Sequence, residues 1–287
     1  MSSAEEREVI PIHRLYLDFV EFLNAMTTSG DPWQIYGEKY LIPNAEFLTT
    51  YWEKSGFSLT QIQERVTRLR REDYSTLLDF LHQGCLEDFV KSAIQRSREM
   101  LDAPFPDIYL FVGFFSSDGF VIELAGTPVI GIGLERFEEL DRLHPTLPHE
   151  YCHYYLKLKG DIPATMQGSQ IFSEGIASFF SQMVYPQQPL YRHLFFTRSR
   201  LNSCIQSEPH VFDVLRGRSL EEIQSLLRHG DECMQIPPRM GNYVSYRLVC
   251  DLMNELGKKQ VHELLHDKRL VETWHLILAT KLHARGT

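Results

Sequence analysis

The feature that most constrains this chain is a pair of histidines with three residues between them, in the run His149-Glu150-Tyr151-Cys152-His153. Residues four apart lie on one face of an α-helix, so a helix here turns both imidazoles the same way. Two neutral imidazoles at this spacing can bind one zinc ion, and the neighbouring Glu150 can reach a water molecule held by that ion. The run therefore predicts a helix that carries two metal ligands, His149 and His153, and a general base, Glu150.

A catalytic zinc site takes three protein ligands and leaves one position for water. Glu174, with 20 residues between it and His153, is the predicted third ligand, which makes one Zn²⁺ per chain the expected cofactor. We expect Pro148 to stand in the first turn of the histidine helix and Ser173 to cap the helix of Glu174. Small residues after Glu174 predict a close approach between helices. The alternative is a buried helix whose two histidines only form hydrogen bonds.

The histidine run, followed by Glu174-Gly175-Ile176-Ala177, resembles the gluzincin metallopeptidases. It looks most like the aminopeptidase N-like branch and bacterial families of predicted zinc-dependent proteases, over residues 108–257. The resemblance implies hydrolysis of peptide or peptide-like amide bonds, with water activated by zinc and Glu150 as general base. It also implies a Tyr or His that stabilises the oxyanion from a helix downstream of the Glu ligand. Tyr243 is the first candidate for that role and Tyr246 the second.

The same resemblance suggests residues that bind the substrate. Aminopeptidases of the class hold the free amino terminus with a Glu in a glycine-rich segment, and Gly131-Ile-Gly133-Leu-Glu135 is similar to it. Its distance from the histidine run is shorter than in that branch, and Glu135 at the start of a helix is an equal alternative. We expect residues 126–135 to form an edge strand that pairs with an extended substrate. Arg247 can bind a substrate carboxylate, or it is solvated or structural.

The hydrophobic pattern predicts an α+β fold that is predominantly helical. Apolar residues at 12, 15, 16, 19, 20 and 23 indicate a helix over 12–26, and helical patterns continue to residue 100. Short β-branched and aromatic runs at 107–115, 119–125 and 127–134 indicate a small mixed or antiparallel sheet, packed against the zinc helix. We expect three parts: an N-terminal helical region (1–103), a catalytic core (104–185) and a C-terminal helical region (186–287), whose last helix covers 270–283.

Composition and charge exclude several classes of protein. A net charge of −9 argues against nucleic acid as a partner, and the one basic cluster, Arg65, Arg68, Arg70 and Arg71, is interpreted as a solvated helix face. No apolar run is long enough to span a membrane. The acidic N-terminus and the odd number of cysteines, 5, are typical of a cytoplasmic protein with reduced thiols. Cys152 faces away from the histidines and is not expected to bind the metal.

Three functions fit these observations. The first is a cytoplasmic zinc metallopeptidase that acts on a peptide or a small amide. The second is a gluzincin-like enzyme that modifies a small molecule, because a fold and a site do not fix the substrate. The third is a non-catalytic binding protein stabilised by zinc, against which the intact Glu150 counts. The sequence does not indicate an oligomeric state.

Overall fold

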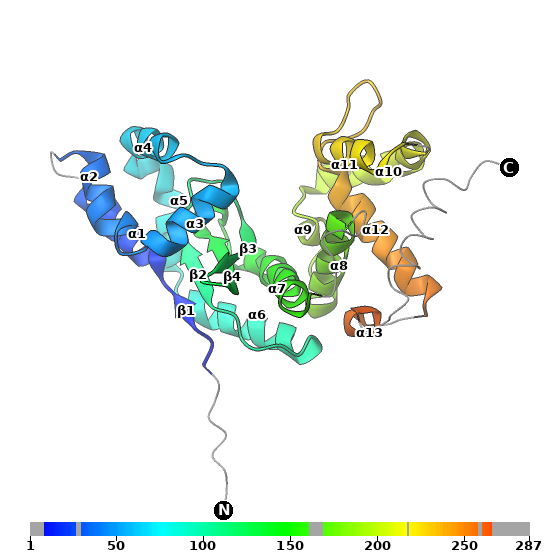
Figure 1. The fold of residues 1–287 in the computed structure, drawn as a ribbon, viewed down its shortest axis with the longest axis horizontal. Helices are drawn as coiled ribbons and strands as arrows, with labels where there is room; N and C mark the ends of the chain where they lie inside the picture. The colour runs from blue at the N-terminus through cyan, green and yellow to red at the C-terminus, as the bar shows by residue number, and fades with distance from the viewer. Residues whose placement is uncertain (1–8, 27–29, 161–168, 217, 258–259, 266–287) are drawn as a thin grey trace, which may run out of the picture. The chain divides into compact units, whose positions relative to one another are not determined.

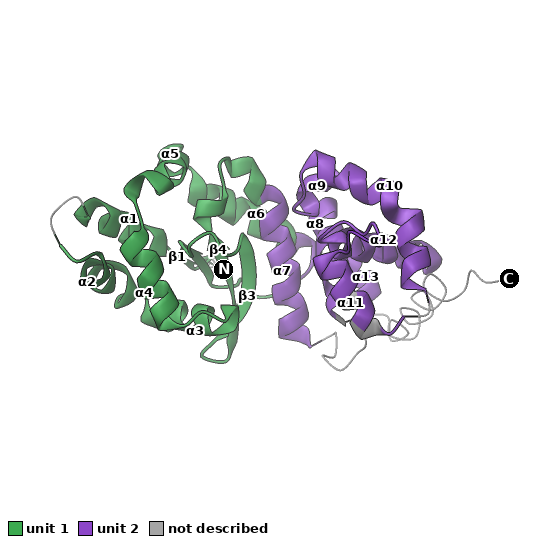
Figure 2. Ribbon diagram, turned by 90° about the horizontal axis from the view of Figure 1, so that it is seen from above, with its two compact units in different colours: residues 1–98, 103–143 green, residues 99–102, 144–287 purple. Residues whose placement is uncertain are grey.

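The computed structural model describes residues 9–26, 30–160, 169–216, 218–257 and 260–265. The chain divides into two compact units, which Figure 2 shows in green and purple. The first unit comprises residues 1–98 and 103–143, and the second comprises 99–102 and 144–287. This division differs from the three expected parts, because a boundary falls inside the segment 104–185. The sheet groups with the N-terminal helices, and the histidine run groups with the C-terminal helices.

The first unit joins a small sheet to a set of helices (Figure 1). Its helices are α1 (Leu15–Ala25), α2 (Pro32–Tyr36), α3 (Ala45–Ser55), α4 (Leu59–Arg68), α5 (Ser75–His82) and α6 (Leu86–Met100), with short η1 (Gly37–Leu41), η2 (Arg71–Tyr74), η3 (Leu134–Arg136) and η4 (Leu140–Arg142). The helix expected over 12–26 begins only at Leu15, because Ile12 and His13 form strand β1 (Ile12–His13).

The sheet has four strands in the order β1-β2-β4-β3. β2 (Ile108–Phe111), β3 (Gly119–Leu124) and β4 (Thr127–Gly133) lie where the sequence predicts strands. β1, β2 and β4 run parallel, and β3 pairs with β4 in the antiparallel sense, so the sheet is mixed. Ala125 and Gly126 connect β3 to β4 with positive φ angles of 48° and 80°, as a two-residue hairpin requires.

The prediction that residues 126–135 form an edge strand is wrong. β4 is an inner strand, since it pairs with β2 on one side and β3 on the other. The backbone of Gly131 is in register with Tyr109 on one neighbour and Phe120 on the other, and Gly133 with Phe111. The chain's own strands therefore occupy the pairing positions that we had assigned to a substrate.

The second unit is helical in the part that the structure describes. It contains α7 (Leu143–Lys159) from His144 onward, and α8 (Ser169–Val184), α9 (Leu190–His193), α10 (Arg198–Leu215), α11 (Leu220–His229), α12 (Met240–Glu255) and α13 (Val261–Leu265). α8 and α12 form its most extensive helix pair and lie next to each other in Figure 1. The helix expected over 270–283 lies outside the described residues.

The predicted fold class, α+β with a helical majority and a small mixed sheet, is confirmed. Within the described residues, no helix is both long and apolar enough to cross a membrane.

Candidate metal centre

The histidine run lies within α7, as its spacing predicts. Pro148 does not stand in the first turn, since α7 begins at Leu143 and continues through the proline. Proline has no backbone N–H, so the carbonyl four residues earlier receives no helical hydrogen bond from it. The helix continues all the same, and Leu147 and Tyr151, which come before and after Pro148 in the sequence, are completely buried. The packing of this face thus keeps the helix intact across the proline.

Glu174 lies in α8, one turn further into the helix than expected. α8 begins at Ser169, so Ser173 is an internal residue whose hydroxyl donates to the carbonyl of Gln170 (3.0 Å) and caps nothing. The prediction of a cap at Ser173 is therefore wrong. The position of Glu174 within an established helix still fixes the direction of its side chain.

The structure brings His149, His153 and Glu174 together. The two imidazole Nε2 atoms are 3.1 Å apart. His149 Nε2 lies 3.5 Å from Glu174 Oε2, and His153 Nε2 lies 3.5 Å from Glu174 Oε1. Two residues from α7 and one from α8 thus present nitrogen and oxygen atoms toward a common point.

These separations fit a metal ion. Zinc binds His nitrogen and carboxylate oxygen at about 2.0–2.2 Å, and a tetrahedral arrangement then places neighbouring ligand atoms about 3.3–3.6 Å apart. The three observed separations, 3.1–3.5 Å, are close to that range. Two imidazoles and one carboxylate are also a donor set that suits zinc. The two carboxylate separations end on different oxygens of Glu174, and one ligand atom from each residue lies within 4.8 Å of the others, so the three residues can hold one ion once these atoms draw together.

The electrostatics of the three groups are strongly coupled. Burial lowers the pKa of His149, which favours the neutral imidazole. Burial also opposes the charge on His153, but the adjacent Glu174 carboxylate outweighs it and raises the pKa of His153. The two histidines lower the pKa of Glu174 well below its ordinary value, although burial acts in the opposite direction. At neutral pH Glu174 is thus an anion beside two imidazoles, which is the state that a metal ligand needs.

Glu150 is almost completely buried, at 6% exposed, although it is a charged residue. Its negative charge contributes to the raised pKa values of His153 and of the Cys152 thiol. The Glu150 charge therefore acts on His153, a member of the group of His149, His153 and Glu174 that could hold a metal ion (the metal-ligand cluster). Cys152 is a fully buried free thiol, and burial raises its pKa. It does not belong to the cluster.

Residues that the sequence did not indicate surround His149. The ring of Phe195 meets the His149 imidazole edge-on, with centroids 4.9 Å apart. His149 Nδ1 is buried and has no hydrogen-bond partner within the described part of the chain. The ring is therefore oriented by its packing against Phe195, because no hydrogen-bond partner of Nδ1 lies among the described residues. Phe195 itself has a φ of +55°, unusual for a bulky residue, and no sequence pattern marks it.

A second unforeseen group is a buried network next to the cluster. The Ser181 hydroxyl donates to the carbonyl of Pro145 (2.7 Å) and lies 2.7 Å from His193 Nδ1. The hydroxyl has only one proton, so His193 Nδ1–H is the donor in the second bond. Burial lowers the pKa of His193 to about 4, so its ring is neutral at pH 7. The network joins α7, α8 and α9, and the lone His193 gave no signal in the sequence.

A glycine fixes the crossing of α8 and α12. A Cβ atom on Gly175 would lie 2.3 Å from the backbone oxygen of Ser245, so the two helices touch at this point. This confirms the close approach that the small residues after Glu174 predict. The contact follows Glu174 directly in sequence, so the packing of α12 also bears on the position of the Glu174 carboxylate.

The tyrosines proposed for the oxyanion have other partners in the structure. The Tyr243 hydroxyl donates to Glu208 Oε2 (2.6 Å), and the Tyr246 hydroxyl donates to Gln182 Oε1 (2.6 Å). Arg247 Nε donates to Glu208 Oε1 (3.2 Å), so Arg247 forms an ion pair within the protein. Burial is the largest cause that raises the pKa of both phenols. Each of these side chains is thus ordered by a contact outside the metal-ligand cluster.

The residues proposed to bind a substrate amino terminus lie in the first unit. A Cβ atom on Gly131 would lie 2.4 Å from the Phe120 ring, and one on Gly133 would lie 2.3 Å from the carbonyl of Ser117. Both glycines thus make room for the chain's own residues. Glu135 follows β4 in η3, the alternative left open by the sequence. Its Oε1 accepts hydrogen bonds from the amides of Gly113 (2.6 Å) and Phe115 (2.9 Å).

Searches of family models, of curated proteins and of solved structures find no match to this chain. The resemblance to gluzincins stays a prediction, which rests on the sequence motifs in α7 and α8.

Proposed function

We propose that this protein is a zinc-dependent hydrolase that cleaves peptide or peptide-like amide bonds. The observation that carries the proposal is the convergence of His149, His153 and Glu174 at separations of 3.1–3.5 Å, with Glu150 buried next to them. A purely structural site has no use for a second carboxylate that does not bind the metal, whereas a hydrolytic site needs a base. We keep the cytoplasm as its expected compartment.

His149, His153 and Glu174 would hold the zinc ion, which when bound lowers the pKa of a water molecule and polarises a carbonyl group. The carboxylate of Glu150 takes the proton of the attacking water and delivers it to the leaving amine. Phe195 packs against His149, and the hydrogen bonds of Ser181 and His193 hold α7, α8 and α9 together around the site.

Tyr243 and Tyr246 remain the proposed donors to the developing oxyanion. Both lie on α12, whose backbone touches α8 at Gly175. Each hydroxyl must exchange its present acceptor, Glu208 or Gln182, for the substrate in order to act. The ion pair with Glu208 makes Arg247 the less direct candidate for binding a substrate carboxylate.

The first test is Glu150→Gln, assayed with a panel of fluorogenic peptides with and without a chelator. We expect turnover to fall by about 10³-fold, the usual effect of losing general acid–base catalysis. The zinc content, measured after dialysis, should stay at one per chain. Glu255→Gln, which changes an exposed glutamate at the end of α12, is the matched control and should leave both quantities unchanged. Full activity of Glu150→Gln would remove Glu150 from the mechanism.

The second test compares Tyr243→Phe with Tyr246→Phe. The variant that removes the oxyanion donor should lower kcat by about 100-fold, as for other oxyanion-hole donors, and leave zinc binding intact. The other variant should change only stability, by about 1 kcal/mol for one lost hydrogen bond. Unchanged turnover in both variants would place the donor on another residue.

A further inference from the structure

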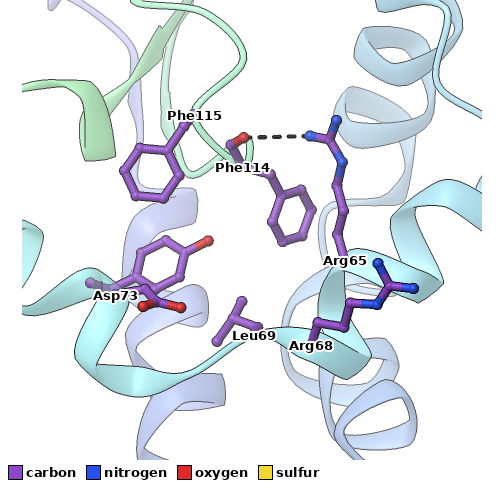
Figure 3. Close-up of a pocket in the computed structure, with 7 residues that line it drawn as sticks. Arg65, Arg68, Leu69, Asp73, Phe114 and Phe115 are labelled. Atoms are coloured by element: carbon purple, nitrogen blue, oxygen red, sulfur yellow. Dashed lines mark hydrogen bonds between the residues drawn. The ribbon is translucent and has the colours of Figure 1, made fainter.

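A pocket in the first unit lies between α4, η2 and the loop that follows β2. Its cavity volume is about 400 Å³, within the range of sites for small molecules. In Figure 3, Arg65 and Arg68 lie along one side, Leu69 lies below, and Asp73 and Phe115 lie on the opposite side. Phe114 and Tyr74 complete the lining. All of these residues belong to the first unit, so the pocket is independent of the metal-ligand cluster.

The pocket lies at a favourable position in the sheet. The parallel strands β2 and β4 end side by side, with Phe111 in register with Gly133. The loop with Phe114 and Phe115 follows the first strand, and η3 with Glu135 follows the second. In sheets with parallel strands, ligands bind at the carboxyl ends of the strands, where the loops diverge. Phe114 and Phe115 of the pocket wall come from such a loop, and the other lining residues come from α4, η2 and the connection between them.

The loop after β2 is held in an unfavourable backbone conformation. Phe114 and Phe115 have φ angles of +58° and +59°, a region that aromatic residues rarely adopt, and they are consecutive. The Glu135 carboxylate stabilises this conformation through the amides of Gly113 and Phe115, and the Ser116 hydroxyl donates to the carbonyl of Gly113. Backbone strain that the surrounding structure maintains is a feature of ligand sites. Here it directs two rings to the pocket.

The positive charges at the pocket are not neutralised. Arg68 has no hydrogen bond or ion pair with any residue that the structure describes. Among the residues that the structure describes, Arg65 donates only to the carbonyl of Phe114 (3.4 Å), and it lies over the Phe57 ring at 4.4 Å. The one acidic residue of the lining, Asp73, is already paired with Arg70 through both carboxylate oxygens (2.9 and 3.4 Å). Two guanidinium groups are thus available to an anion.

We propose that this pocket binds a small molecule with a carboxylate on an aromatic or flat apolar body. The Arg65 and Arg68 guanidinium groups bind the carboxylate, for which their fork of N–H donors is suited. Phe114, Phe115 and Leu69 cover the apolar body. The volume admits one ring with a short chain, and the exposure of both arginines keeps the charged end near solvent.

The test is a ligand-observed NMR titration of the full chain with 3-phenylpropionate. We expect saturable binding with a Kd of about 1 mM, since the ligand is small and partly exposed. The neutral 3-phenylpropanamide and the ringless acetate should each bind at least about tenfold more weakly, since each lacks one of the two contacts. Absent saturation, or equal binding of either analogue, would overturn the proposal.

Variants locate the site. Arg68→Gln should weaken 3-phenylpropionate binding about fivefold, as for the loss of one exposed ion pair, and the Arg65→Gln, Arg68→Gln double variant should remove it. Phe115→Ala should weaken it about threefold. Lys39→Gln removes an exposed charge of the same unit away from the pocket and is the matched control. Because Arg65 and Arg68 are exposed, folding should be retained, with circular dichroism as the check. Affinity that is unchanged in the double variant would place the ligand elsewhere.

Discussion

Two glutamates of this chain have opposite surroundings. Glu174, in the second unit, is half-buried beside two histidines that lower its pKa well below the ordinary value. Glu135, in the first unit, is buried without a cationic partner of that kind. Burial raises its pKa to about 7, although the amides of Phe115 and Gly113 favour the charged form. Its second oxygen, Oε2, has no hydrogen-bond partner within the described residues.

The comparison shows how surroundings decide what a carboxylate does. Imidazole groups keep Glu174 ionised, which is the charge state that metal binding requires. Backbone amides tie one oxygen of Glu135 to the loop after β2, so this acid is an acceptor that stabilises an unusual backbone conformation. Three predictions test this contrast, starting with the largest expected effect.

Glu174→Gln should weaken zinc binding, and Glu135→Gln should not. The binding free energy of zinc in protein sites is about 10–16 kcal/mol. Shared among four ligands this is about 2.5–4 kcal/mol each, so the loss of one should raise the Kd by about 70- to 900-fold. Competition with a chromogenic chelator measures the Kd of both variants and of the wild type. Equal affinities in all three would place the third ligand elsewhere and break the contrast.

Glu135 should make the first unit less stable as the pH rises. Its folded pKa of about 7 lies above its ordinary value of 4.5, so between these pH values the folded chain keeps a proton that the unfolded chain has lost. Stability is therefore greatest below pH 4.5 and falls as the pH rises to about 7, by about 3 kcal/mol. Glu135→Gln cannot titrate and lacks this contribution.

The measurement is urea unfolding of wild type and Glu135→Gln at several pH values. The difference in the free energy of unfolding, wild type minus variant, should fall by about 3 kcal/mol between pH 4.5 and pH 8. A difference that stays constant over this range would show that Glu135 has no raised pKa.

Gly175 follows Glu174 in the sequence, and Gly133 lies two residues before Glu135. Alanine substitutions at the two glycines should have different effects on zinc binding. Gly175→Ala and Gly133→Ala both place a Cβ 2.3 Å from a backbone oxygen, and each should lower the free energy of unfolding by about 1–3 kcal/mol. Only Gly175→Ala should also weaken zinc binding, because it displaces α8 beside Glu174. Gly37→Ala, where nothing lies within 4 Å, is the control. Equal zinc affinity in Gly175→Ala and Gly133→Ala would show that the crossing of α8 and α12 has no influence on the metal-ligand cluster.

Much of the fold was predictable from local patterns, and several of the errors share one cause. Strands β2, β3 and β4 and the histidine helix follow from hydrophobic periodicity and spacing. Strand β1 was missed because two residues carry no periodicity, and they become a strand only by pairing with β2. The edge position assigned to β4 was wrong because strand order depends on which distant segments pair. Phe195 and His193 were missed for the same reason, since no local signal links them to His149.

The sequence by itself determined which side chains share a helical face, and hence that His149 and His153 point to one place with Glu150 beside them. Helical geometry fixes relations over four residues without reference to the rest of the chain. Only the tertiary structure decided that Glu174 completes the cluster, that Glu135 holds the loop after β2, and that Tyr243 and Tyr246 have other partners. These contacts join segments that only the packing of the whole chain brings together, and their energies depend on burial that no short run of residues encodes.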